Sequence, residues 1–270
     1  MISGQSDAQV EIMAYNKGMY IRAITRQPGE NFADGLTTST LGRPSYPLIF
    51  QQHEAYRQAL KDLGVEVIVL PAESAYPDAY FVEDPAIVTP KIAVITRPGA
   101  LSRQGEELTL EPVLRRYRSV AHIQPPGTVE GGDILMVENH FFIGLSDRTN
   151  KEGAAQLAKL LKDAGHTAET VPVVSGLHLK SGVNYVGKNT LLVTNSLADH
   201  PAFARYNKIL IDPDEEYAAN TLWVNDILLT PKGFPKTYAK LTRLGIRVIE
   251  LDVSEVQKMD GGLTCMSLRL

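Results

Sequence analysis

The sequence is poor in cysteine and tryptophan and has no long apolar run. Its 270 residues include one cysteine, Cys265, and one tryptophan. The chain can therefore form no internal disulfide, and a lone cysteine suits a reducing compartment. No apolar run approaches the ~20 residues that span a bilayer, and the N-terminus has no basic stretch followed by an apolar core. We therefore expect a cytoplasmic protein with no membrane segment and no signal peptide.

An excess of positive charge is also lacking. The formal net charge is −4, and no basic patch runs along the chain, which argues against nucleic acid as a partner. A single thiol cannot build a thiolate metal centre, and the six histidines never occur as a close pair. We therefore expect chemistry that uses no metal ion and no other cofactor.

Short apolar segments bounded by glycine, proline or aspartate predict a series of strands. The predicted strands are residues 21–25, 65–70, 86–88, 92–96, 119–123, 134–137, 140–144, 168–173, 183–186, 190–193, 208–211, 222–224, 227–229, 247–251 and 263–268. Apolar spacing near 3.6 predicts helices at residues 50–63, 106–116, 150–164 and 234–244. Three of these helices end at a glycine suited to a C-cap, Gly64, Gly165 or Gly245.

The predicted elements repeat as strand–helix–strand modules, most clearly in residues 139–173 and 225–251, with a related segment at 46–71. A module that recurs every ~50 residues favours an α/β fold with radial repetition over one doubly wound sheet. No linker divides the chain, so we expect a single domain spanning residues 1–270. Residues 28–47, rich in threonine, glycine and serine, predict a long loop that could serve as a substrate lid.

Cys265 follows a turn signal, Asp260-Gly261-Gly262. Glycine allows backbone to come close to a ligand, and residues 263–268 alternate like a short strand, which would put the thiol beside that backbone. Free cysteine is nevertheless among the most buried residue types. The local sequence therefore leaves two interpretations open, a nucleophile and a small core residue.

A nucleophilic cysteine needs a proton shuttle and benefits from an orienting carboxylate. His178 lies in a short apolar segment bracketed by glycines, where a histidine without a catalytic role is the alternative. Glu130 and Asp133 flank a Gly-Gly pair, and a solvated turn is the alternative there. Glu83 and Asp84 interrupt an apolar run. Burying them without a partner would be costly, so they indicate a cationic ligand or an internal arginine.

Three arginines outside the predicted helices, Arg97, Arg103 and Arg148, can each bind a carboxylate through two hydrogen bonds. For each of them, a surface loop charge is the alternative.

Five segments together resemble the dimethylarginine dimethylaminohydrolases of the guanidino-group-modifying (pentein) superfamily: residues 81–84, 130–133, 144–150, 177–181 and 259–265. They occur in the family's order, and the resemblance covers the chain from about residue 20 to the C-terminus. Each segment alone is a weak signal, and the set is specific. The resemblance implies a five-bladed, pseudo-symmetric α/β propeller (the pentein fold) with its site at the central axis. That agrees with the repeated modules.

The resemblance also implies an activity, the hydrolysis of asymmetric dimethylarginine or monomethylarginine to citrulline and dimethylamine or methylamine. Cys265 would attack the guanidinium carbon and form a covalent thiouronium intermediate. His178 would protonate the leaving amine and then activate water, with Glu130 orienting it, while Asp84 pairs with the guanidinium. The other substrate-binding residues implied are Glu83 as a support, Asp78 and Phe81 in the pocket, Leu36 in the lid, and Arg103 and Arg148 on the α-carboxylate, with Arg97 as the alternative to Arg103.

These residue types suit the substrate. A guanidinium is planar and always charged at neutral pH, so carboxylates are needed to hold it. Breaking its resonance needs a strong nucleophile and protonation of the leaving nitrogen. A bound cation also favours a thiolate beside it, so we expect substrate to lower the pKa of Cys265.

Other readings stay open. Arginine deiminases typically carry an aspartate two residues after the histidine, where this chain has Lys180. Agmatine deiminases have no α-carboxylate to bind, and amidinotransferases differ in the group that accepts the amidino unit. A catalytically silent binding module, as in ribosome-associated members of the superfamily, would not need the cysteine, histidine and acids. The family often forms homodimers, which suggests a second copy of the chain as partner beside the small-molecule substrate.

Overall fold

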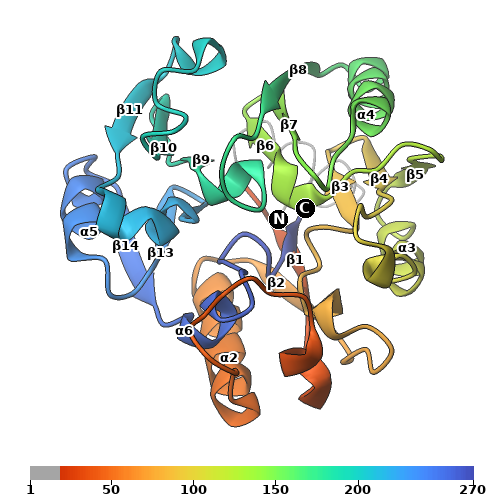
Figure 1. The fold of residues 1–270 in the computed structure, drawn as a ribbon, viewed down its shortest axis with the longest axis horizontal. Helices are drawn as coiled ribbons and strands as arrows, with labels where there is room; N and C mark the ends of the chain where they lie inside the picture. The colour runs from red at the N-terminus through yellow and green to blue at the C-terminus, as the bar shows by residue number, and fades with distance from the viewer. Residues whose placement is uncertain (1–18) are drawn as a thin grey trace, which may run out of the picture.

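The computed structural model describes residues 19–270, which form five three-stranded sheets arranged around a common centre (Figure 1). The sheets are β1 (Arg22–Arg26) with β2 (Glu66–Leu70) and β15 (Leu268–Arg269); β3 (Ala86–Val88), β4 (Ile92–Ile95) and β5 (Ser119–His122); β6 (Ile134–Val137), β7 (His140–Leu145) and β8 (Thr167–Pro172); β9 (Val183–Tyr185), β10 (Thr190–Val193) and β11 (Asn207–Leu210); and β12 (Leu222–Val224), β13 (Ile227–Pro231) and β14 (Arg247–Leu251).

Every sheet repeats one pattern. Its central strand pairs antiparallel with one neighbour and parallel with the other. A parallel pair needs a crossover connection, and four of the five crossovers carry a helix on the outside of the ring (Figure 1): α2 (Tyr46–Asp62), α3 (Glu107–Leu114), α4 (Lys151–Asp163) and α5 (Pro235–Thr242). The β10–β11 crossover carries a 3₁₀ turn instead, η6 (Pro201–Phe203).

Short helical segments occur in the connections between the strands. They are η1 (Glu30–Asp34), η2 (Pro77–Tyr80), η3 (Leu101–Arg103), η4 (Gly131–Asp133), η5 (Leu179–Ser181), η7 (Pro213–Ala219) and α6 (Ser254–Gln257). The candidate site residues lie in these connections, except Arg148, which lies between β7 and α4.

Apolar clusters lie between consecutive sheets and close the ring. Ile24 of β1 packs in one cluster with Ile95 of β4, and Ile87 of β3 packs in the next with Phe141 of β7. The three remaining clusters join β6 and β7 to β9 and β10, β10 to β13, and β12 and β13 back to β1. Because β15 pairs with β1, both ends of the described chain lie in one sheet, and the turn before β15 is held at the centre.

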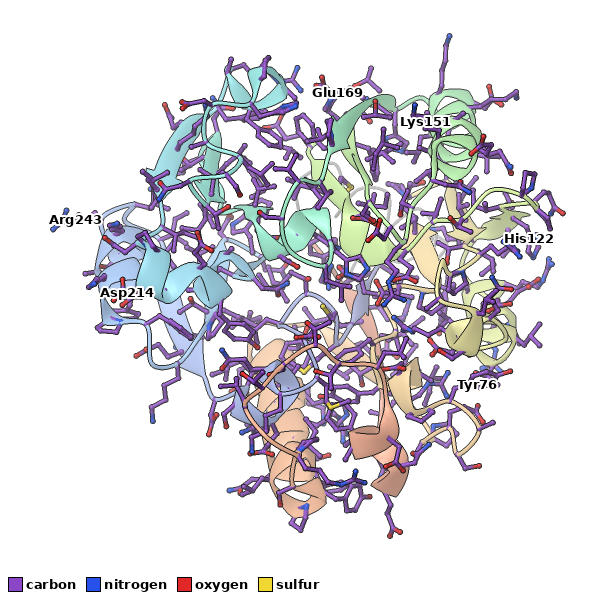
Figure 2. The ribbon with its side chains drawn as sticks, viewed as in Figure 1. Tyr76, His122, Lys151, Glu169, Asp214 and Arg243 are labelled. Atoms are coloured by element: carbon purple, nitrogen blue, oxygen red, sulfur yellow. The ribbon has the colours of Figure 1, made fainter. Side chains whose placement is uncertain are left out.

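The four predicted helices are all present, as are the predicted strands up to residue 251, within a few residues at their ends. The capping glycines Gly64, Gly165 and Gly245 have positive φ angles, as expected after a helix. Side chains fill the space between the modules, while residues such as His122, Glu169 and Asp214 lie at the rim (Figure 2).

Two predictions differ from the structure. The strand predicted at residues 263–268 is wrong, because residues 263–266 form a turn and β15 holds only Leu268 and Arg269. The backbone groups of this turn bond to side chains instead of a ladder: Leu263 O accepts from the Tyr56 hydroxyl, and Thr264 N donates to Asn220 Oδ1. Residues 28–47 are mostly loop, but they contain η1 and the start of α2.

Within the described residues, no helix has the length and apolar character needed to cross a bilayer.

Candidate active site

A cavity at the centre of the ring gathers nearly all the predicted site residues. Its lining comprises Leu36, Thr37, Thr38, Asp78, Phe81, Asp84, Arg103, Glu130, Arg148, Leu177, His178, Met259, Asp260, Gly261 and Cys265. These residues come from connections in several modules, so no single stretch of sequence forms the site. Glu83 does not line it, and neither does Arg97, the alternative to Arg103.

His178 and Glu130 form a buried pair at this cavity. His178 Nε2 lies 2.8 Å from Glu130 Oε2, and Glu130 Oε1 accepts a hydrogen bond from Ala100 N at 3.2 Å. Burial lowers the pKa of His178, but the negative charges of Asp84, Glu130 and Asp133 outweigh this effect and raise the pKa above its usual value. The imidazole can therefore hold a proton, as a general acid must.

The Gly-Gly pair in η4, Gly131 and Gly132, allows this packing. A Cβ on Gly132 would lie 2.4 Å from His178 Nδ1, so a residue with a side chain would displace the ring. Gly132 N also donates to Asp84 Oδ1 at 2.8 Å. The pair therefore sets the position of an imidazole and of a carboxylate, and it is not the solvated turn that the sequence left as an alternative.

Asp84 stays ionised although it is buried. Burial raises its pKa, but Arg103, His178 and the Gly132 N–H outweigh burial and hold the pKa at about 2. The closest of these contacts joins Arg103 Nη1 to Asp84 Oδ2 at 2.7 Å. The internal arginine that the sequence allowed as a partner is therefore present.

Arg103 is buried, and protein acceptors surround its guanidinium. Besides Asp84, it bonds to Glu106 through Nε and Nη2 and to the carbonyl oxygens of Asp78 and Phe81. These contacts tie it to the wall of the cavity. Arg97 does not line the cavity and contacts Gln104.

Arg148 also lines the cavity. It is partly exposed, and its Nη1 lies 3.7 Å from Glu130 Oε1, a looser contact than those of Arg103. Of the three predicted arginines, Arg148 therefore has the side chain best placed to turn toward an incoming carboxylate.

Cys265 lies in the turn before β15, with its thiol at the cavity. Its N–H donates to Gly262 O at 3.2 Å, and its carbonyl accepts from Glu83 N at 3.2 Å. Burial, together with the charges of Glu83 and Asp84, raises the pKa of Cys265 to about 12, although Lys180 acts to lower it. Without a cation in the cavity the group is therefore a thiol.

Glu83 faces away from this cavity. It pairs with Lys180 and, at 2.9 Å, with Arg269, and it lines a separate cavity with both of them. The neighbours Glu83 and Asp84 thus line different cavities. Glu83 forms an internal ion cluster with Lys180 and Arg269.

The loop of residues 28–47 reaches over the cavity. Leu36 N donates to both carboxylate oxygens of Asp78 at 3.1 Å. Thr38 donates through its N–H and its hydroxyl to Asp260 Oδ2, and the Thr37 hydroxyl donates to Lys258 O. The loop is therefore fastened on both sides of the cavity, to η2 and to the segment before Cys265.

Three ligand atoms, one each from Asp84, Glu130 and His178, lie within 4.8 Å of one another. An imidazole with two carboxylates is a set that a divalent ion could use, and spacing in the sequence could not reveal it because the residues are far apart in the chain. The same carboxylates form the anionic wall suited to a guanidinium.

Several residues at the site were not predicted. Thr37, Thr38 and Asp260 hold the loop, and Glu106 holds Arg103. In the sequence, Glu106 stands three residues after Arg103, a spacing that is common for ion pairs on protein surfaces. Only its burial in the structure shows that it belongs to the site. Asp260 is part of the turn signal before Cys265, but the sequence does not indicate that it binds Thr38.

Comparison with known proteins identifies the family. The chain is 46% identical over 253 residues to an N(G),N(G)-dimethylarginine dimethylaminohydrolase of Pseudomonas aeruginosa, covering 93% of this chain and 100% of the relative. It is 34% identical over 251 residues to the enzyme of the same name from Streptomyces coelicolor, covering 92% and 96%. The chain belongs to the dimethylarginine dimethylaminohydrolase family.

Structural comparison agrees with this family. The fold matches the P. aeruginosa dimethylarginine dimethylaminohydrolase complexed with citrulline, with a TM-score of 0.92 at 45% identity over 93% of this chain and 100% of the other. The N-terminal domain of the cyanobacterial arginine dihydrolase ArgZ matches with a TM-score of 0.83 at 20% identity, covering 92% and 97%, and shows the fold alone. The arginine deiminase family model matches residues 74–183. The predicted five-module propeller and the predicted family are confirmed.

Proposed function

We propose that this dimethylarginine dimethylaminohydrolase family member hydrolyses Nω-methylated arginines to citrulline and methylamine or dimethylamine. The observation that carries the proposal is the grouping of Cys265, His178, Glu130 and Asp84 around one cavity, in a chain 46% identical to an enzyme of that name. The same group of side chains argues against a silent binding module.

The substrate guanidinium lies against Asp84 and Glu130 in this proposal. Their carboxylates pair with the fixed positive charge, and Arg148 takes the α-carboxylate. Arg103 acts through Asp84, because its donors already contact Asp84, Glu106 and main-chain oxygens. This role differs from the carboxylate-binding role that the sequence resemblance implies. Asp78 and Phe81 shape the pocket, and Glu83 supports the floor.

Substrate binding ionises Cys265. The thiol has a raised pKa in the free protein, and the bound guanidinium adds a positive charge beside it, which favours the thiolate. The thiol proton passes to solvent water, Sγ bonds to the guanidinium carbon, and His178 gives its proton to the departing amine as the C–N bond breaks. A thiouronium remains on Cys265.

Hydrolysis of the thiouronium reverses the roles. His178, now neutral, takes a proton from water, and the resulting hydroxide attacks the same carbon. The C–S bond then breaks, the hydroxyl proton passes to the leaving sulfur, and citrulline and the Cys265 thiol form. Glu130 holds the imidazole in place through both steps. We also propose one catalytic domain, with residues 28–47 as the lid. A cytoplasmic location and a homodimer stay predictions.

The test is citrulline and amine release by the wild type and by Cys265→Ser, with asymmetric dimethylarginine, monomethylarginine and arginine side by side. We expect stoichiometric citrulline and alkylamine from the methylated substrates and a loss of at least ~1,000-fold in the variant. Turnover of arginine alone would move the protein to the deiminases. No turnover of any of the three would refute the proposal.

A further inference from the structure

Asp133, which has no role in the steps above, touches two of the segments that carry site residues. Its side chain is fully buried. Oδ1 accepts a hydrogen bond from Leu179 N at 3.0 Å, directly after His178. Oδ2 accepts from the Ser146 hydroxyl at 2.6 Å. Both oxygens accept, which is the pattern of an ionised carboxylate.

Ser146 extends this contact to Arg148. Its hydroxyl oxygen accepts hydrogen bonds from Arg148 N at 3.0 Å and Thr149 N at 3.2 Å, which fixes the turn that presents the Arg148 side chain. One buried carboxylate therefore holds the histidine segment with one oxygen and the arginine turn with the other.

Glu130 closes the network. Its N–H donates to Thr149 Oγ1 at 3.1 Å, and its carbonyl accepts from Asp133 N at 3.0 Å. The segments bearing Glu130, Arg148 and His178 are thus all connected through hydrogen bonds to Asp133, directly or through Ser146. They come from separate connections of the ring, and packing of the strands alone would not fix them relative to one another at the level of a hydrogen bond.

We propose that Asp133 is a positioning residue that couples the α-carboxylate site at Arg148 to the acid–base pair His178–Glu130. It touches neither substrate nor the reacting atoms. It sets the distance between the two ends of the substrate site, so that an arginine backbone held at Arg148 places its guanidinium carbon at Cys265. This inference rests on the proposed function.

The carboxylate also contributes charge. His178 faces Glu130 and Asp133 from the η4 segment and Asp84 from the segment before β3, and these three acids raise its pKa. Arg148 lies near Glu130, Arg103 pairs with Asp84, and Cys265 lines the same cavity. Neutralising Asp133 removes one of the acids that favour the imidazolium.

Asp133→Asn tests the proposal because the amide keeps the shape but has only one acceptor oxygen. Either Leu179 N or the Ser146 hydroxyl then loses its acceptor. We expect kcat/KM for asymmetric dimethylarginine to fall about 10- to 100-fold, and the basic limb of the pH–rate profile to move to lower pH. Ser146→Ala releases only the arginine turn, so we expect a raised KM with an unmoved basic limb.

Glu215→Gln is the matched control. Glu215 is a buried carboxylate whose two oxygens accept from Lys236 N and Thr237 N at the start of α5, in another module. It should cost stability without changing KM or the pH profile. If Asp133→Asn behaves like Glu215→Gln, losing only stability, the proposal is wrong.

A measurement without turnover separates this proposal from the proposed function. NMR titration of the His178 imidazole in unliganded wild type and Asp133→Asn should show a lower pKa in the variant. If no methylarginine is hydrolysed but the titration shifts, the proposed function fails and the link from Asp133 to His178 stands. An unshifted titration in an active protein overturns the link alone.

Discussion

The pair Glu130–His178 and the loop of residues 36–38 face the same cavity, but the fold holds them in different ways. Glu130 is 1% exposed, and its segment bonds to Ala100, Thr149 and Asp133. Leu36 is 43% exposed, and the loop is held mainly through the carboxylates of Asp78 and Asp260. In the proposed function, the first arrangement fixes the geometry for proton transfer, and the second releases to admit substrate. Disturbing the two sides should therefore give different kinetic signatures.

The largest effect should come from the charge of Glu130. Glu130→Gln keeps the size of the side chain but removes a negative charge that faces both His178 and the guanidinium. We expect kcat/KM to fall ~100- to 10,000-fold. The basic limb of the pH profile should also move to lower pH, because this charge raises the pKa of His178. A loss below about tenfold would show that Glu130 is not part of the acid–base pair.

A smaller effect should follow from Gly132→Ala. The added methyl would lie 2.4 Å from His178 Nδ1, so the ring must shift, and a shift of about 1 Å can cost ~100-fold in rate. The loss should fall on kcat more than on KM. Gly233→Ala, at a site with nothing within 4 Å but with a positive φ, controls for the backbone cost of replacing a glycine. Equal kinetics for the two variants would contradict the packing argument.

The smallest effect should come from the loop. Asp260→Asn weakens the acceptor that holds Thr38 but leaves the acid–base pair in place. We expect KM to rise about three- to tenfold with kcat nearly unchanged. A fall in kcat comparable to that of Gly132→Ala would mean that the two sides of the site do not act separately.

The sequence allowed most of the fold to be predicted, because strand alternation, helical spacing and capping glycines are local signals. It failed at residues 263–268, where the alternation of Leu263 to Leu268 suggested a strand. There the tertiary hydrogen bonds of Tyr56 and Asn220 hold a turn instead. Propensity over a few residues cannot register a partner more than 40 positions away.

The candidate site shows the same division. Cys265, His178, Glu130 and Asp84 were found through motifs that the structure brings together at one cavity. The sequence does not show the direction in which a side chain points. Glu83 and Asp84 are adjacent, yet Glu83 pairs with Lys180 and Arg269, while Asp84 lines the cavity. The partners of Arg103 were hidden for the same reason, since burial decides whether an arginine binds substrate or the protein.

The central claim is that Cys265 forms a covalent adduct from which the methylated nitrogen has already departed. Mass spectrometry of acid-quenched wild-type protein, saturated in turn with asymmetric dimethylarginine and with monomethylarginine, tests this directly. We predict the same mass increment from both substrates, located on the peptide that carries Cys265, because the two leaving amines differ and the remaining thiouronium does not. Increments that differ by the mass of one methylene unit (CH2), the difference between the two substrates, or an adduct on another residue, would contradict the account.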